Sequence, residues 1–102
     1  MYLWVKLTAN SKASIIKGMD ELLNRLDHIE RAIPTIRNKV ARLDLLKMLK
    51  NIDTAMNAVS RESVECRRLH RETGHYRELV QKAEQLIANL EQHLTFAALL
   101  NG

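Results

Sequence analysis

The sequence predicts an all-α protein, a single domain (residues 1–102) that folds as an antiparallel, coiled-coil-like bundle of three helices. Strong helix formers such as Leu, Ala, Glu, Lys, Arg and Gln dominate the 102 residues, whereas Gly (three) and Pro (one) are scarce. Apolar residues recur at alternating spacings of three and four, the pattern of a helix with one buried side. The length is that of one domain with one core.

Residues 1–11 are expected to form a short extended arm. Their side chains alternate with a period of two, with Leu3, Val5 and Leu7 on one side and Tyr2, Trp4 and Lys6 on the other. A lone strand has no pairing partner in a helical chain, so the arm either packs across the bundle or contacts another protein. Trp4, the only tryptophan, is a candidate anchor for such a contact.

The first helix is predicted over residues 12–33, with Asn10, Ser11 or Ser14 as its N-cap. Its apolar stripe has the spacings 4, 3, 4, 3, 4 and consists of Ile15, Met19, Leu22, Leu26, Ile29 and Ile33. We expect Pro34 to end this helix, because proline disfavours helical geometry in the residue before it and suits the first turn of the next helix.

The second helix is predicted over residues 35–59 and carries two apolar stripes in different heptad frames. The stripes are Ile36, Val40 and Leu43, followed by Leu45, Leu49, Ile52, Met56 and Val59. The break between them, near residues 43–46, is a stutter that locally changes the supercoil. The segment "LDLLKMLK" is apolar over most of its circumference, which predicts a central position in the bundle.

The third helix is predicted over residues 60–98 and is expected to be the longest. Its clearest stripe is Val80, Ala83, Ile87, Leu90, Leu94 and Ala97. A start after Gly74 is the alternative to a start at Ser60. In a helical projection, Cys66, Leu69 and Thr73 continue the stripe and the arginines gather opposite. We therefore expect a continuous helix that begins at Ser60, its N-cap, and overhangs its neighbours.

The totals limit the partners and the compartment. A net charge of +4 and a pI near 9.5 allow nucleic-acid binding without requiring it, since 12 acidic residues are interspersed among 16 basic ones. A single cysteine cannot form an internal disulfide and fits a reducing compartment. The sequence has neither a convincing secretion signal nor an apolar run of about 18–20 residues. We expect a cytoplasmic protein that does not associate with membranes.

The stretch "VECRRLHRETGHYREL" (64–79) holds the residues with the most chemistry. Cys66 and His70 are the best nucleophile and base pair, but no Gly-rich loop or oxyanion-hole turn accompanies them. On a continuous helix His75 projects away from both, so only two metal ligands converge. We expect no enzyme activity, no cofactor and no metal site.

The preferred interpretation is a non-enzymatic protein-interaction module: a small adaptor, an assembly chaperone or a subunit of a helical complex. It would bind a helical partner by helix–helix packing and form a homodimer. Residues 96–100, "FAALL", are apolar on every side, although they could instead close the protein's own core. The candidate anchors are Trp4, Phe96, Leu99 and Leu100, with Arg67, Arg68 and Arg71 as a basic rim. The alternative is a nucleic-acid-binding helix face at 61–77 made of Arg61, Arg67, Arg68, Arg71 and Arg77.

Overall fold

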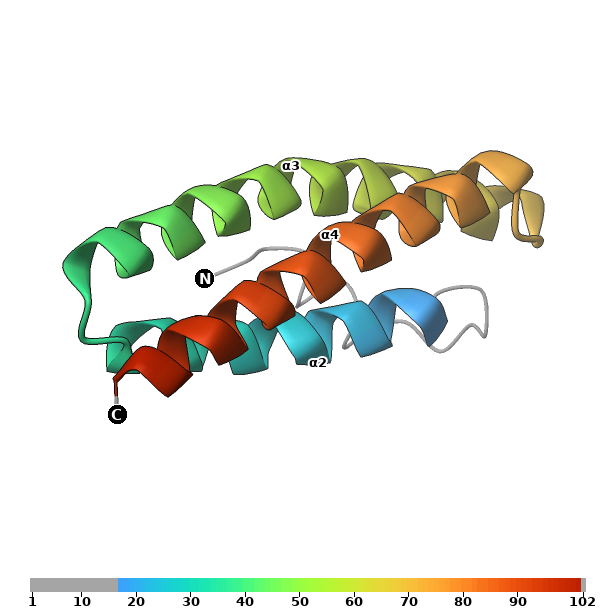
Figure 1. Cartoon of the computed structure of the whole chain (residues 1–102). Coiled ribbons are helices and arrows are strands. Elements are labelled where there is room, and N and C mark those ends of the chain that lie inside the picture. The colour runs from blue at the N-terminus through green and yellow to red at the C-terminus, as the bar shows by residue number, and fades with distance from the viewer. Residues whose placement is uncertain (1–16, 102) are drawn as a thin grey trace.

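The computed structural model describes residues 17–101, with side chains from Met19 onward, and confirms the all-α three-helix bundle. The described helices are α2 (Lys17–Ala32), α3 (Lys39–Leu69) and α4 (Gly74–Leu100), and a 3₁₀ turn, η2 (Ile33–Thr35), follows α2. α3 runs antiparallel to α2 and α4 (Figure 1). The predicted arm at 1–11, Trp4 and the predicted helix start at residue 12 lie outside the described residues.

Pro34 ends the first helix, as its sequence predicts. α2 stops at Ala32, Pro34 lies within η2, and Ile36 then takes an extended backbone with ψ of 122°. The second helix starts at residue 39 rather than 35, because the Asn38 side chain accepts a hydrogen bond from the Ala41 N–H (3.0 Å) and caps α3 there.

The predicted boundary between the second and third helices, at residues 59 and 60, is wrong. α3 continues through it for 31 residues and ends at Leu69. Ser60 is a buried residue within α3, not an N-cap, and its carbonyl accepts a hydrogen bond from Ser63 Oγ (2.6 Å). A serine hydroxyl can donate to a carbonyl one turn earlier inside a helix, as Ser63 does here, so a serine does not by itself mark a helix end.

The chain reverses at residues 70–73 instead. His70 adopts the left-handed conformation (φ 58°), and its N–H bonds back to the carbonyl of Arg67. Thr73 then caps α4 by accepting a hydrogen bond from the Tyr76 N–H (3.0 Å). Among the described helices α3 is therefore the longest, because α4 has 27 residues and not the 39 predicted for residues 60–98.

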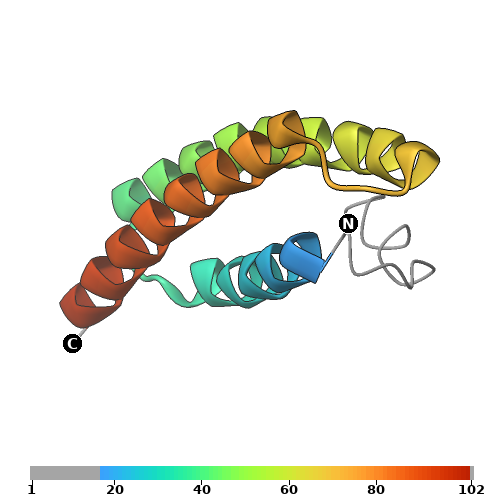
Figure 2. The same cartoon turned by 90° about the vertical axis from the view of Figure 1, so that its right-hand side faces the viewer.

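The core lies where α4 packs against both α3 and α2. Figure 2 shows α3 and α4 side by side with α2 below them. The described members of the predicted stripe of the first helix are buried, as are Leu45 to Val59 of the second stripe in α3. The buried apolar residues are Met19, Leu22, Leu23, Leu26, Ile29, Ile33, Ile36, Leu45, Leu49, Ile52, Met56, Val59, Cys66, Tyr76, Ala83, Ile87, Leu90 and Ala97.

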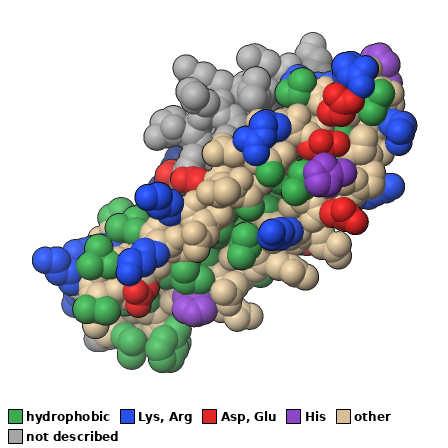
Figure 3. All heavy atoms as spheres, turned by 90° about the horizontal axis from the view of Figure 1, so that it is seen from above, with side chains coloured by type: hydrophobic (Ala, Val, Ile, Leu, Met, Phe, Trp, Pro, Cys, Tyr) green, Lys and Arg blue, Asp and Glu red, His purple; other side chains and the backbone are tan. Residues whose placement is uncertain are grey.

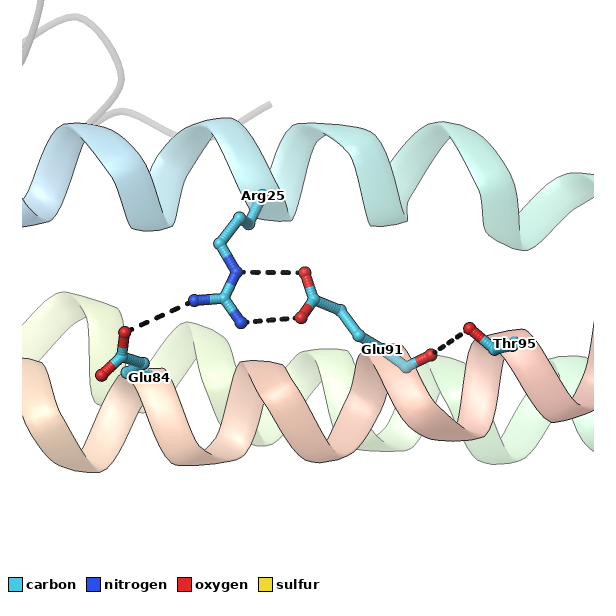
Figure 4. Close-up of polar contacts among 4 residues, drawn as sticks. All are labelled: Arg25, Glu84, Glu91 and Thr95. Carbon is cyan, nitrogen blue, oxygen red and sulfur yellow. Dashed lines mark hydrogen bonds and ion pairs between the residues drawn. The ribbon is translucent and has the colours of Figure 1, made fainter.

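An ion pair ties α2 to α4 beside this core (Figure 4). Arg25 donates from Nε and Nη2 to the two carboxylate oxygens of Glu91 (3.0 and 2.7 Å), and its Nη1 lies 3.6 Å from Glu84 Oε2. The bidentate hydrogen bond lowers the pKa of Glu91 and raises that of Arg25. Glu84 and Glu91 thereby mark the side of α4 that faces α2.

Candidate functional site

The three described anchor candidates lie on the last turns of α4 and point to solvent. Phe96, Leu99 and Leu100 expose 64%, 73% and 63% of their surface. They do not close the protein's own core, so the alternative considered for the "FAALL" segment is wrong for these three side chains. Ala97, between them, is buried and holds the turn against the bundle.

Three further exposed apolar residues come from the start of α3, at the same end of the molecule. Val40, Leu43 and Leu46 are 68%, 51% and 45% exposed. The predicted stripe of Ile36, Val40 and Leu43 is therefore buried only at Ile36, and the prediction that "LDLLKMLK" sits centrally is wrong. Only Leu45 and Leu49 of this segment are buried. The stutter in the sequence indicates that this part of α3 has two apolar faces, because two heptad frames on one helix point in different directions. In this fold only one of the two faces the core.

We call these six residues the terminal apolar surface: Val40, Leu43, Leu46, Phe96, Leu99 and Leu100. Figure 3 shows hydrophobic side chains gathered toward this end of the bundle, with Lys and Arg side chains around them. Large exposed apolar side chains that cluster in this way mark association surfaces on proteins.

Two depressions cross this end of the molecule. The outer groove, about 400 Å³ in volume, is lined along α3 by Val40, Leu43, Asp44, Leu46, Lys47 and Lys50. The terminal hollow, about 180 Å³, lies between α3 and α4 and is lined by Ala41, Asp44, Leu45, His93, Phe96, Ala97 and Leu100. Asp44 belongs to both, so the depressions adjoin across one turn of α3.

Asn101 fixes the end of α4 that carries Phe96, Leu99 and Leu100. Its Oδ1 accepts a hydrogen bond from the Arg37 N–H (2.9 Å), and its Nδ2 donates to the carbonyl of Thr35 (3.0 Å). The Asn101 side chain thus binds the backbone of two residues in the α2–α3 connection, Thr35 and Arg37. The apolar periodicity of the last helix does not reveal this role of Asn101.

The five arginines of the predicted basic face do not share one helix face. Arg61, Arg67 and Arg68 belong to α3, Arg71 to the 70–73 turn and Arg77 to α4, because the helix predicted to carry them is interrupted. Arg68 is paired with Glu65, whose pKa the hydrogen bond from Arg68 lowers. Arg67 is half-buried. Nucleic-acid binding through these residues stays a prediction, without the continuous face that motivated it.

Cys66 is buried at the reversal, not presented for chemistry. Its Sγ lies 3.7 Å from Thr73 Oγ1, which in turn donates to Glu62 Oε2 (2.8 Å). Tyr76 is buried nearby, and burial raises its pKa to about 12. In residues 19–101, no group of three His, Cys, Asp or Glu side chains is placed to hold a metal ion. Cys66 and Thr73 were predicted correctly to lie on the inner side, although the prediction assumed a continuous helix over residues 60–98 that the structure does not contain.

None of the described helices combines the length and apolar character needed to cross a bilayer. The chain matches no protein-family model, and comparisons with curated proteins and with solved structures returned no significant match.

Proposed function

We propose that this protein is a non-enzymatic protein-interaction module that binds a helical segment of another protein. The observation that carries the proposal is the terminal apolar surface. Its six large apolar side chains are 45–73% exposed at one end of the bundle, in a chain of only 102 residues. Leaving them in water forgoes roughly 1.5–3 kcal/mol for each side chain that a partner would bury.

A helix is the form of partner that suits the outer groove best. The groove follows α3 from Val40 to Lys50, about 15 Å at 1.5 Å per residue, which is roughly three turns of a docked helix. Amphipathic helices bind such grooves through side chains at positions i, i+3 or i+4 and i+7. Val40, Leu43 and Leu46 supply an apolar ridge for that packing.

The charges beside the groove favour an acidic partner helix. Lys47 and Lys50 line it, with Asp44 as its one acidic lining residue. The lysine stems extend the apolar surface while their ammonium groups reach solvent, where they can meet carboxylates that flank the partner's apolar stripe. A cytoplasmic adaptor, an assembly chaperone and a subunit of a helical complex would all work through such a contact.

The test uses two synthetic amphipathic helical peptides with the same leucine positions, one flanked by Glu and the other by Lys. Binding to the purified chain is measured by fluorescence anisotropy. We expect the Glu peptide to bind and the double substitution Leu43→Gln/Leu46→Gln to weaken it about tenfold or more, the usual effect of removing interface anchors. The matched control is Val64→Gln, an exposed apolar position near the other end of α3 that is 51% exposed.

The proposal is wrong if neither peptide binds, or if the Leu43→Gln/Leu46→Gln variant and the Val64→Gln control bind equally well. An arm with single-stranded and duplex oligonucleotides separates the alternative. Oligonucleotide binding that is lost on changing Arg61, Arg71 and Arg77 to Gln, with no peptide binding, would assign the basic residues around the turn as the functional surface instead.

A further inference from the structure

A second heptad stripe runs along α4 outside the core. Its spacings are 3, 4, 3, 4, 3, 4, and it consists of Leu79, Lys82, Leu86, Asn89, His93, Phe96 and Leu100. Leu79 and Leu86 are half-buried against the core, and the other five are exposed. The stripe lies on the side of α4 away from Glu84 and Glu91, so α2 does not cover it. A heptad stripe of this kind is the seam on which a further helix packs.

Two hollows lie along the junction of α3 with this stripe. Besides the terminal hollow there is a central hollow of about 210 Å³, lined by Asn51, Thr54, Ala55, Ala58, Leu79, Lys82 and Leu86. The α4 residues of the two hollows correspond over two heptads, since Leu79, Lys82 and Leu86 lie 14 residues before His93, Phe96 and Leu100. The hollows are thus about 21 Å apart along α4.

The two hollows differ in shape in a complementary way. The terminal hollow has large exposed side chains at its edge, Phe96 and Leu100. On its α3 side, the central hollow is lined by Asn51, Thr54 and the small residues Ala55 and Ala58. The large side chains at the edge of a terminal hollow can therefore fill a central hollow. Within one chain they cannot meet, because they are fixed along the same rigid helix.

We infer that α4 of a second copy of this chain packs antiparallel against the stripe, with Asn89 of each copy at the two-fold axis. Phe96 and Leu100 of each copy then enter the central hollow of the other, and the same contact forms twice, as two-fold symmetry requires. Asn89 meets Asn89 of the second copy, where each amide offers both a donor and an acceptor. A polar residue at such a position sets the register of paired helices.

The charges along the stripe select the antiparallel orientation and a second copy as the occupant. A parallel pair would place Lys82 against Lys82 of the second copy, a like-charge contact. In the antiparallel pair Lys82 reaches the terminal hollow of the second copy, where Asp44 lies and where the ring of Phe96 is available to the lysine stem. Asp44 and Lys82, the charged lining residues of the two hollows, thus become partners.

The stripe is long enough for a helix–helix interface between two copies. A specific interface needs about 800 Å² from each partner, and the molecule measures 49 × 23 × 17 Å along its principal axes. The stripe extends over 22 residues of α4, from Leu79 to Leu100, or about 33 Å at 1.5 Å per residue.

This inference rests on the proposed function in using helix–helix packing and shares Phe96 and Leu100 with the terminal apolar surface. The peptide test uses Leu43 and Leu46 of the outer groove, which are not on the α4 stripe, so the two can fail separately. Oligomeric state is measured by sedimentation equilibrium across a wide concentration range, with circular dichroism as the check on folding. We expect a dimer for the unmodified chain. Phe96→Ser/Leu100→Ser should raise the dissociation constant about tenfold or more. Leu99→Ser, in the same turn but off the stripe, should leave it within about twofold.

A charge exchange tests the orientation. Lys82→Asp and Asp44→Lys should each weaken the dimer, and the double variant should restore it, since the two charges meet only in the antiparallel pair. A dimer that the double variant does not restore would overturn this geometry. So would an unmodified chain that stays monomeric at every concentration, or equal effects of Leu99→Ser and Phe96→Ser/Leu100→Ser. A monomer that still binds the Glu peptide would leave the proposed function standing, and a monomer that binds neither peptide would remove both.

Discussion

The two ends of the α3–α4 pair differ in how far they bury their apolar side chains. At the turn end, Cys66 and Tyr76 are buried, and Thr73 links Glu62 to the first turn of α4. At the terminal end, the same two helices expose the six residues of the terminal apolar surface, although Asn101 holds the backbone in place there. The turn end caps its own helix through Thr73 and packs its own apolar side chains. The terminal end leaves six large apolar side chains exposed.

The largest expected effect is a loss of stability on truncating a buried leucine of α4, compared with an exposed leucine of the same helix. Leu90→Ala removes a fully buried side chain and should lower the free energy of unfolding by about 2–5 kcal/mol. Leu99→Ala, in a side chain that is 73% exposed, should change it by no more than about 0.5 kcal/mol. Urea unfolding followed by circular dichroism measures both. Equal losses would show that Leu99 is covered in solution.

A smaller effect is expected from the polar network of the turn end. Thr73→Val keeps the shape of the side chain but removes the cap of α4 and the bond to Glu62, and should cost about 1–2 kcal/mol. The matched control is Thr95→Val, because Thr95 Oγ1 bonds to the carbonyl of Glu91 inside a helix and caps nothing. If the Thr95 variant loses as much stability, the 70–73 turn does not depend on its cap.

The clamp at the terminal end should contribute about 1 kcal/mol through its two hydrogen bonds. Asn101→Ala should therefore speed hydrogen exchange of the amides in the last turn of α4, while those around Ile87 and Leu90 keep their protection. Asn101→Asp retains the acceptor for the Arg37 N–H but loses the donor to the Thr35 carbonyl, so its effect should be intermediate. Unchanged exchange in both variants would show that Leu99 and Leu100 are not held by this contact.

The smallest effect, about 1 kcal/mol or less, is expected from the Arg25–Glu91 pair, because solvent screens both partly exposed groups. The pKa of Glu91 is lower in the folded chain, so its stabilisation is present above the unfolded pKa, about 4.3, and is lost as the pH falls through the folded value. Glu91→Gln should be less stable than the unmodified chain at pH 7, and the difference should shrink as the pH falls below about 4.3. Glu72→Gln is the control, and a similar pH-dependent difference in that variant would assign the effect to net charge.

The interior of the bundle was largely predictable, whereas one boundary and one surface were not. The heptad stripes from Met19 to Ile33 and from Leu45 to Val59 are buried, because a residue's side of a helix follows from spacing alone. The boundary at Ser60 failed because Ser60 and Thr73 are both plausible caps. Their outcomes differ only because α4 has to return along α3 and bury Tyr76 beside Cys66.

The terminal apolar surface also has a part that the sequence predicted and a part that it did not. Phe96, Leu99 and Leu100 were found because they make a helix end apolar on all sides, more than one core can bury. Val40 and Leu43 were predicted to lie on an apolar stripe as regular as that of Leu45 and Leu49, but they are exposed. Periodicity reports that a face is apolar, but not whether the chain itself covers it. Trp4, the fourth predicted anchor, lies outside the described residues.

The sequence by itself determined that this protein is helical, that Pro34 ends its first described helix, and which residues of each core stripe turn inward. These properties depend on local propensity and on the 3.6-residue period. The tertiary structure alone decided that α3 runs on to Leu69 and that its second apolar face looks outward. Both depend on where α4 lies, because a single neighbouring helix can cover only one side of α3.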